Sequence, residues 1–218
     1  MKKLLYKELR LSLHPMYFFF VLMGAMMLIP EYNYYVMFIY TSMVVINNIF
    51  TTGKANKDVE YTAMLPISKR DVVKARFLTV MLYQLVNVAV AAVFAVVANI
   101  IYGNGENPGG IDRNVAFFGF VFIMLGVFNI SYLTAFYKTA NKMLRPVIMG
   151  MLSLVVCIGA FETVSQYVSS PLGAYLDAST VSGVIMQIPV LLGGIILYAL
   201  LNILGYRISA KRFERLDL

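Results

Sequence analysis

The stretch Phe77–Tyr102 reads FLTVMLYQLVNVAVAAVFAVVANIIY and contains no charged residue. A helix crosses a hydrocarbon layer of about 30 Å with about 20 apolar residues, so this stretch is long enough to span a bilayer. Five further apolar runs are bounded by charged residues, Pro, Gly or Asn. They are Pro15–Ile29, Tyr34–Phe50, Val115–Tyr137, Val147–Tyr167 and Ser182–Tyr206. The sequence therefore predicts an all-α polytopic membrane protein with six transmembrane helices, forming one domain over residues 1–218.

The composition supports a membrane protein and offers no catalytic centre. Of 218 residues, 60% are hydrophobic and 13% are charged, whereas soluble domains have roughly 25% charged residues. The single cysteine, Cys157, excludes an internal disulfide, and with one histidine, His14, no His/Cys metal cluster can form. We expect no enzymatic activity and no cofactor in this chain. Glu8 and Arg10 interrupt the N-terminal apolar run, so we expect the first hydrophobic segment to be retained.

The basic residues indicate the orientation. Seventeen of the 18 Lys and Arg residues fall on one side of the predicted spans, and Arg113 alone falls on the other. Because basic loops remain cytoplasmic, we expect both termini in the cytoplasm. Scattered among apolar runs, these residues do not form the basic face that nucleic acid requires. They lie in four segments: Lys2, Lys3, Lys7 and Arg10; Lys54, Lys57, Lys69, Arg70, Lys74 and Arg76; Lys138, Lys142 and Arg145; Arg207, Lys211, Arg212 and Arg215.

The first two apolar runs are short, and a turn at residues 30–33 joins them. Tyr32 at the end of this turn, with Tyr34 and Tyr35 just past it, resembles an interfacial aromatic belt. That belt favours a full crossing, while a re-entrant hairpin is the alternative.

Two segments on the basic side are expected to form short helices. Residues 1–14 alternate basic residues with leucines on one helical face, which predicts an amphipathic elbow helix along the membrane surface. This elbow is either a topogenic anchor or a functional element. Residues 51–76 form an insert with a predicted helix at Asn56–Leu65, stopped by Pro66. Ser68 and Asp71 then predict a helix start at Lys69. From spacing alone, the insert is either an ordinary capped loop or a surface for a soluble partner.

The stretch from Asp58 to Arg76, DVEYTAMLPISKRDVVKAR, resembles a segment of small bacterial type-2 ABC exporter permeases. These include the membrane subunits of phenol-soluble-modulin and antimicrobial-peptide exporters. The chain length, the six spans and the basic N-terminal elbow match as well. One departure is Arg76, where a lysine is common, and the charge is kept.

The resemblance implies a fold, partners and a substrate class. The insert would be a coupling helix in a groove of a separate ABC ATPase, which supplies ATP and Mg. A second permease copy, as a homodimer, would complete the exporter in the bacterial plasma membrane. Amphipathic or antimicrobial peptides, or other hydrophobic compounds, would be the substrate. The chain lacks a GxxxxGK[ST] phosphate loop, so its energy must come from elsewhere. The residues implied to contact the ATPase are Asp58, Glu60, Tyr61, Met64, Leu65, Pro66, Ile67, Ser68, Lys69 and Arg70.

Polar groups in the spans have two interpretations. Glu162 in the fifth span is a candidate pathway residue, or an interfacial carboxylate. Interhelical hydrogen bonding is expected to outweigh substrate contact for Gln84, Asn87, Asn99, Asn129, Ser131 and Thr134. Close helix approach is expected at Gly150, Gly193 and Gly194.

Two other functions remain as alternatives. An ion-coupled secondary transporter would show paired buried carboxylates or interrupted half-helices, which the sequence does not display. A non-transporting immunity or sensor protein of the membrane would fail to bind an ATPase.

Overall fold

The computed structural model of the protein describes residues 2–12, 14–63, 67–103, 107, 109–139, 142–164 and 181–215. Within these ranges every regular element is helical, which agrees with the all-α prediction. In chain order the elements are α1 (Lys2–Ser12), α2 (Tyr17–Val21), the 3₁₀-helix η1 (Leu22–Leu28), α3 (Tyr35–Tyr40), the π-helix η2 (Thr41–Ile46), α4 (Asn47–Ala55), α5 (Asp58–Ala63), α6 (Lys69–Tyr102), α7 (Val115–Thr139), α8 (Leu144–Glu162) and α10 (Val181–Glu214).

Among the described residues, five helical segments are long and apolar enough to cross a membrane. They are Tyr35–Ala55, which combines α3, η2 and α4, and Lys69–Tyr102, Val115–Lys138, Leu144–Glu162 and Ile185–Glu214. Each overlaps one of the last five predicted spans, and the end of the predicted span Val147–Tyr167 lies outside the described residues. The protein is therefore a multi-pass membrane protein.

The first predicted span is shorter than the others. Its apolar helix covers Tyr17–Leu28 and reaches about 22 Å, against a hydrocarbon layer of about 30 Å. The turn after it nevertheless contacts the connection between α6 and α7, because Asn107 Nδ2 donates to the carbonyl oxygen of Tyr32 at 3.0 Å. Asn33 Nδ2 also donates to Glu162 Oε1, at the C-terminal end of α8, at 3.1 Å. The turn therefore lies at the same end of the bundle as the α6–α7 connection, and a sixth crossing by this segment stays a prediction.

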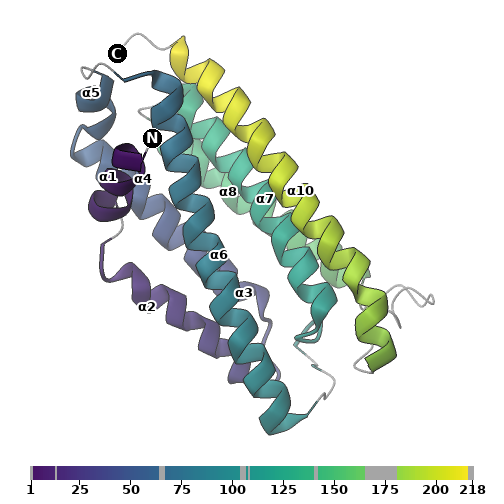
Figure 1. Ribbon diagram of the computed structural model, residues 1–218. Helices are drawn as coiled ribbons and strands as arrows, with labels where there is room; N and C mark the ends of the chain where they lie inside the picture. The colour runs from purple at the N-terminus through teal and green to yellow at the C-terminus, as the bar shows by residue number, and fades with distance from the viewer. Residues whose placement is uncertain are drawn as a thin grey trace.

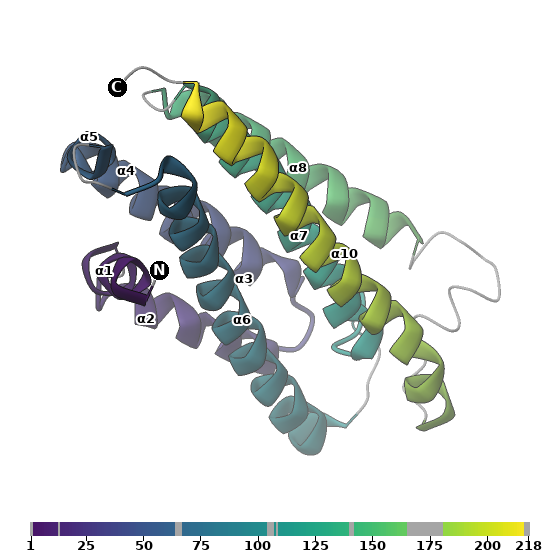
Figure 2. The ribbon, with the colours of Figure 1, turned by 45° about the horizontal axis from the view of Figure 1, so that its top comes forward.

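The long helices lie side by side in the bundle (Figure 1). α7 lies between α8 and α10, and α6 packs against both α10 and η1. Helices α1, α4 and α5 gather beside the N-terminal part of α6, towards the end where the chain termini lie (Figures 1 and 2). We call this the basic end of the bundle, because it includes Lys7, Arg70, Arg76, Arg207 and Lys211. The α6–α7 connection lies at the opposite end.

Glycine allows α7 and α10 to pack closely. A Cβ atom added to Gly194 of α10 would overlap the carbonyl oxygen of Gly119 in α7, and one on Gly119 would lie 2.7 Å from the carbonyl oxygen of Val190. Further along, a Cβ atom on Gly126 would lie 3.2 Å from Cα of Tyr198. Small residues permit this backbone approach in a membrane, where helix association depends on packing and hydrogen bonds.

The other two glycines expected at helix contacts differ from each other. A Cβ atom on Gly150 of α8 would lie 2.8 Å from the ring of Phe128 in α7, so close approach is confirmed there. Gly193 has no heavy atom of another segment within 4 Å of its Cβ position. The expectation for Gly193 was wrong, because one residue rotates the helix by about 100° and turns this position away from α7.

A cluster of amides joins α6, α7 and α10 in the middle of the bundle. Gln84 and Asn129 exchange two hydrogen bonds, at 2.9 and 2.7 Å, as the sequence predicted for these residues. Asn129 also donates to Asn202 Oδ1 at 3.0 Å, and the Tyr198 hydroxyl donates to Gln84 Oε1 at 2.9 Å. All four side chains are buried. Because an unsatisfied amide is costly in a bilayer, this cluster stabilises one arrangement of the three helices.

The neighbouring glycines provide a test of the α7–α10 contact. We expect Gly194→Ala to lower stability by about 1 to 3 kcal/mol, the usual penalty for overpacking. Gly193→Ala, one residue away, should leave stability unchanged. Thermal unfolding in detergent, followed by size-exclusion chromatography of the remaining folded protein, measures both. Equal midpoints for the two variants would contradict the packing described.

Candidate functional site

The site begins with the start of α6. Ser68 has an extended backbone, and its hydroxyl accepts a hydrogen bond from the backbone N–H of Asp71 at 3.1 Å. This N-cap satisfies one free donor of the first turn, and the helix begins at Lys69, as predicted from the sequence. Arg76 consequently lies two turns into α6.

Arg76 is buried, with 1% of its surface exposed. Its Nε donates to Glu8 Oε2 in α1 at 3.2 Å, and its Nη2 donates to Asp58 Oδ2 in α5 at 2.6 Å. The guanidinium carbon lies 5.3 Å from the centre of the Phe50 ring in α4. Gly53, one turn later in α4, provides space, since a Cβ atom there would lie 3.1 Å from Nη2. One guanidinium therefore contacts three other helices.

Asp58 connects this arginine to a second cation. Its Oδ1 accepts a hydrogen bond from Lys7 Nζ of α1 at 2.5 Å. Lys7 Nζ also donates to the Thr62 hydroxyl at 3.0 Å, and that hydroxyl donates to the carbonyl oxygen of Asp58 at 2.5 Å. We call Lys7, Glu8, Asp58, Thr62 and Arg76 the Arg76 cluster.

The Arg76 cluster has two positive and two negative side chains, so its formal charges cancel. Glu8 and Arg76 expose 1% and 2% of their side chains, and Asp58 exposes 19%. Removing one partner from such a buried arrangement leaves an uncompensated charge and is strongly destabilising. The cluster therefore joins α1 and α5 firmly to α6, which continues through the bundle.

Outside this cluster, the ends of α6 and α10 also meet. Arg70 binds Glu214 through two hydrogen bonds, from Nε at 2.6 Å and from Nη2 at 3.2 Å. Lys69 Nζ lies 5.9 Å from the centre of the Phe213 ring. Arg70 and Glu214 are both solvent-accessible, so this ion pair contributes little to stability.

The sequence-predicted ATPase-contact residues divide into several environments. Asp58 faces inward within the Arg76 cluster, whereas Tyr61 on the same short helix is 62% exposed. Ile67 is half-buried, while Ser68 is exposed at the start of α6. The side chain of Glu60 and the whole of Met64, Leu65 and Pro66 lie outside the described residues.

Residues 3–214 match the profile of the ABC-2 family transporter proteins. The chain belongs to this family. No curated protein and no solved structure matches the chain. The chain is therefore a type-2 ABC permease, and its family implies an ABC ATPase as partner.

In this permease, Glu162 lies at the opposite end of the bundle from the Arg76 cluster. Besides the hydrogen bond from Asn33, its Oε1 lies close to Gly110, where a Cβ atom would be 2.6 Å away. Gly110 has a φ of 147°, which favours glycine. The pathway role of Glu162 stays a prediction. Within the described residues, no group of three or more His, Cys, Asp or Glu is placed to hold a metal ion.

Arg113, the one basic residue expected away from the basic end, lies at this opposite end as well. Its guanidinium donates to Asn99 Oδ1 at 2.6 Å, to the Tyr34 hydroxyl at 2.9 Å and to the carbonyl oxygen of Gly103 at 3.1 Å. Arg113 therefore connects the end of α6 to the start of α3.

Sequence reasoning missed Lys7, Glu8 and Arg76 as parts of one site. A signal was present, because Glu8 lies four residues after Leu4 and three after Leu5, on the face that the leucines define. Arg76 similarly lies four residues after the buried Val72. A charge on the apolar face of each of two helices indicates a buried ion pair.

The permease offers a matched pair of arginines in α6. Arg76→Gln should lower the stability by about 3 to 5 kcal/mol, because the carboxylates of Glu8 and Asp58 would lose the positive charge that neutralises them. Arg70→Gln breaks the accessible ion pair with Glu214 and should leave stability nearly unchanged. Arg76→Lys, which keeps the charge and loses the planar fork, should fall between them.

Unfolding by SDS in mixed micelles measures these differences. If Arg76→Gln and Arg70→Gln shared the same unfolding midpoint, the Arg76 cluster would not hold the helices together.

Proposed function

We propose that this permease is the membrane subunit of an ATP-driven exporter, powered by a separate ABC ATPase that binds ATP and Mg. The observation that carries the proposal is the match of residues 3–214 to the ABC-2 transporter family. The family in general implies an ATPase partner, and this chain contains no phosphate-binding loop of its own. In this proposal α5 is the coupling helix and α1 is the elbow helix.

The contacts of α5 support a coupling role. Tyr61 exposes 62% of its surface on one side of α5, where a partner protein can reach it. Asp58, on the same helix, is bound to Arg76 of α6 and to Lys7 of α1. A displacement of α5 by the ATPase would therefore act directly on α6 and α1 through the Arg76 cluster.

The length of α6 indicates how far this displacement would extend. Arg76 and Gln84 are eight residues apart, or about 12 Å along the helix. Gln84 hydrogen-bonds to Asn129 of α7 and accepts from Tyr198 of α10. Movement of α6 at Arg76 would thus reach the amide cluster in the middle of the bundle and bias its arrangement.

The orientation and assembly are part of the same proposal. The basic end faces the cytoplasm of a bacterium, in accordance with the distribution of Lys and Arg, and both termini lie there. Two copies of the permease form the transport unit, each with one ATPase. Amphipathic peptides, antimicrobial peptides or similar hydrophobic compounds are the substrate, a class that the resemblance of residues 58–76 favours.

Two exposed tyrosines test the ATPase-binding surface. Tyr61 lies on α5 and Tyr102 at the opposite end of α6, with 62% and 55% of their surfaces exposed. We expect Tyr61→Ala to weaken binding of the ABC ATPase encoded beside the permease by tenfold or more, since a buried interface tyrosine often contributes about 2 kcal/mol. Tyr102→Ala should bind the ATPase as the wild type does.

The affinity is measured with permease in lipid nanodiscs and purified ATPase, together with ATP turnover of the complex. Absence of ATPase binding to the wild type would contradict the exporter proposal. Equal loss of binding for Tyr61→Ala and Tyr102→Ala would contradict the assignment of α5 as the coupling helix.

A further inference from the structure

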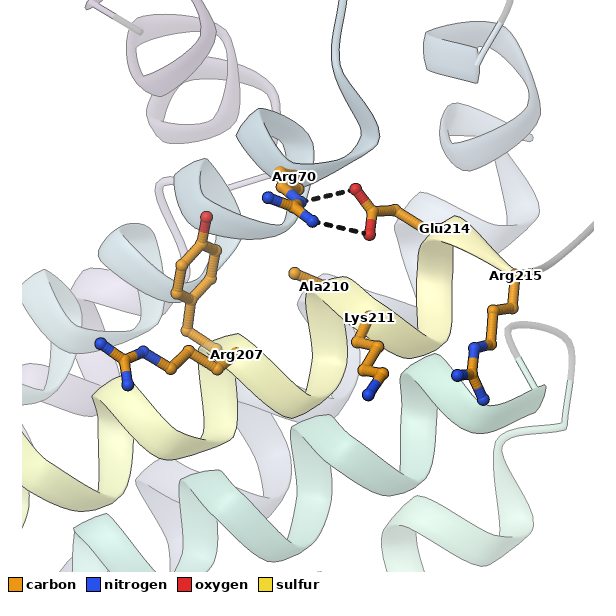
Figure 3. A pocket seen from close by; sticks show the side chains of 7 residues that line it. Arg70, Arg207, Ala210, Lys211, Glu214 and Arg215 are labelled. Atoms are coloured by element: carbon orange, nitrogen blue, oxygen red, sulfur yellow. Dashed lines mark hydrogen bonds and ion pairs between the residues drawn. The ribbon is translucent and has the colours of Figure 1, made fainter.

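An open groove at the basic end lies between the first turn of α6 and the last turns of α10. Its volume is about 500 Å³. Figure 3 shows its side chains, with Arg70 reaching from α6 to Glu214. The lining residues are Arg70, Tyr206, Arg207, Ala210, Lys211, Glu214 and Arg215. The groove is thus lined by four basic side chains and one acidic side chain.

The acidic side chain in the groove already has a partner. Glu214 accepts two hydrogen bonds from Arg70, so these two charges cancel. Arg207, Lys211 and Arg215 are exposed and make no ion pair with another described residue. The groove therefore has an excess of three positive charges.

The spacing of these three residues is unfavourable for an isolated helix. They follow one another at intervals of four, Arg207 and Lys211 in α10 and Arg215 directly after it (Figure 3), and like charges at this spacing destabilise a helix. The adjacent Arg212 behaves differently, because its Nη1 donates to the carbonyl oxygen of Thr134 in α7 at 2.5 Å. An anion in the groove would offset the repulsion among the other three.

The same face of α10 continues into the membrane as an apolar stripe. Ile196, Leu200, Ile203 and Leu204 are exposed by 48 to 59%. At 3.6 residues per turn, they fall within about 120° of the helix circumference together with Arg207 and Lys211. The face thus changes from apolar to basic over one turn, at Leu204–Arg207.

The position of this change matches the depth of lipid headgroups. The segment Ile185–Leu204 contains no charged residue over 20 positions, which is the length that spans the hydrocarbon layer. Arg207 is the first charged residue after that segment, and Lys211 lies about 6 Å further along the helix. Basic pockets of this kind, at the inner end of transmembrane helices, suit anionic headgroups.

We propose that this groove binds an anionic phospholipid, such as phosphatidylglycerol or cardiolipin. The lipid phosphate binds between Arg207 and Lys211, with Arg215 at the rim. The acyl chains lie along the apolar stripe of Ile196, Leu200, Ile203 and Leu204. The Arg70–Glu214 ion pair closes the end of the groove that is farthest from the membrane centre. This lipid connects the end of α10 to the start of α6, beside the Arg76 cluster.

The test uses full-length permease in nanodiscs of phosphatidylcholine with a small fraction of phosphatidylglycerol. The protein is extracted gently, and the lipids that remain bound are quantified by mass spectrometry. Wild-type permease should retain phosphatidylglycerol in preference to phosphatidylcholine. Arg207→Gln with Lys211→Gln should reduce this preference about 25-fold, because each basic residue near a membrane surface strengthens anionic-lipid binding roughly fivefold.

A matched control removes the same two charges elsewhere at the basic end. Arg145→Gln with Lys138→Gln changes two exposed residues that do not line the groove, and it should retain phosphatidylglycerol as the wild type does. If both double variants lost phosphatidylglycerol equally, the lipid would be held by the overall positive charge of the basic end and not by the groove. That result would overturn the proposal. Size-exclusion chromatography verifies that each variant is folded.

Two further outcomes would also overturn the lipid assignment. In the first, inorganic phosphate at millimolar concentration displaces phosphatidylglycerol from the wild type, which would assign the groove to a free phosphate. In the second, the Arg207→Gln, Lys211→Gln variant keeps its phosphatidylglycerol and loses affinity for the purified ATPase, which would assign the groove to the protein partner. Retention of the lipid by the wild type in the presence of phosphate, with loss in the groove variant alone, supports the proposal.

Discussion

A guanidinium group cannot be buried among helices unless its charge is neutralised and its donors are satisfied. Arg76 is buried in this way, and the neutralising carboxylates come from two different segments, Glu8 in α1 and Asp58 in α5. Both short helices are therefore fixed relative to α6 by one side chain. A helix of six residues such as α5 has little stability of its own, so its position depends on this ion pair and on the Lys7 contacts.

The remainder of α6 connects this site with the body of the permease. Beyond Arg76, the helix passes the amide cluster around Gln84 and Asn129 and ends near Arg113, which binds Asn99 of its last turn. Elsewhere in the bundle, α10 and α7 approach so closely at Gly194 that even a methyl group does not fit there. A change at the Arg76 cluster consequently acts on a helix with hydrogen-bonded contacts at its start, middle and end.

Much of this architecture could be predicted from the sequence, because apolar runs of lipid-crossing length and the Ser68 cap are local patterns. The charged site was only partly predictable. The resemblance of residues 58–76 assigned Asp58 to the partner-facing surface, but its carboxylate faces Arg76. Pairing between residues 50 or more positions apart, such as Lys7 and Asp58, depends on how the helices pack. Gly193 and Gly194 could not be distinguished from the sequence either. They are adjacent glycines in one apolar helix, and only the packing of the helices decides which of them faces α7.

Amide hydrogen exchange in α1 and α5 tests the central role of Arg76 most directly, since exchange reports the local opening of each helix. Nanodisc-embedded wild type is compared with Arg76→Gln and with Arg70→Gln, which changes an accessible ion pair in the same helix. We predict faster exchange at Lys2–Ser12 and Asp58–Ala63 in Arg76→Gln alone, with α7 as protected as in the wild type. Unchanged exchange of α1 and α5 in Arg76→Gln would contradict the account.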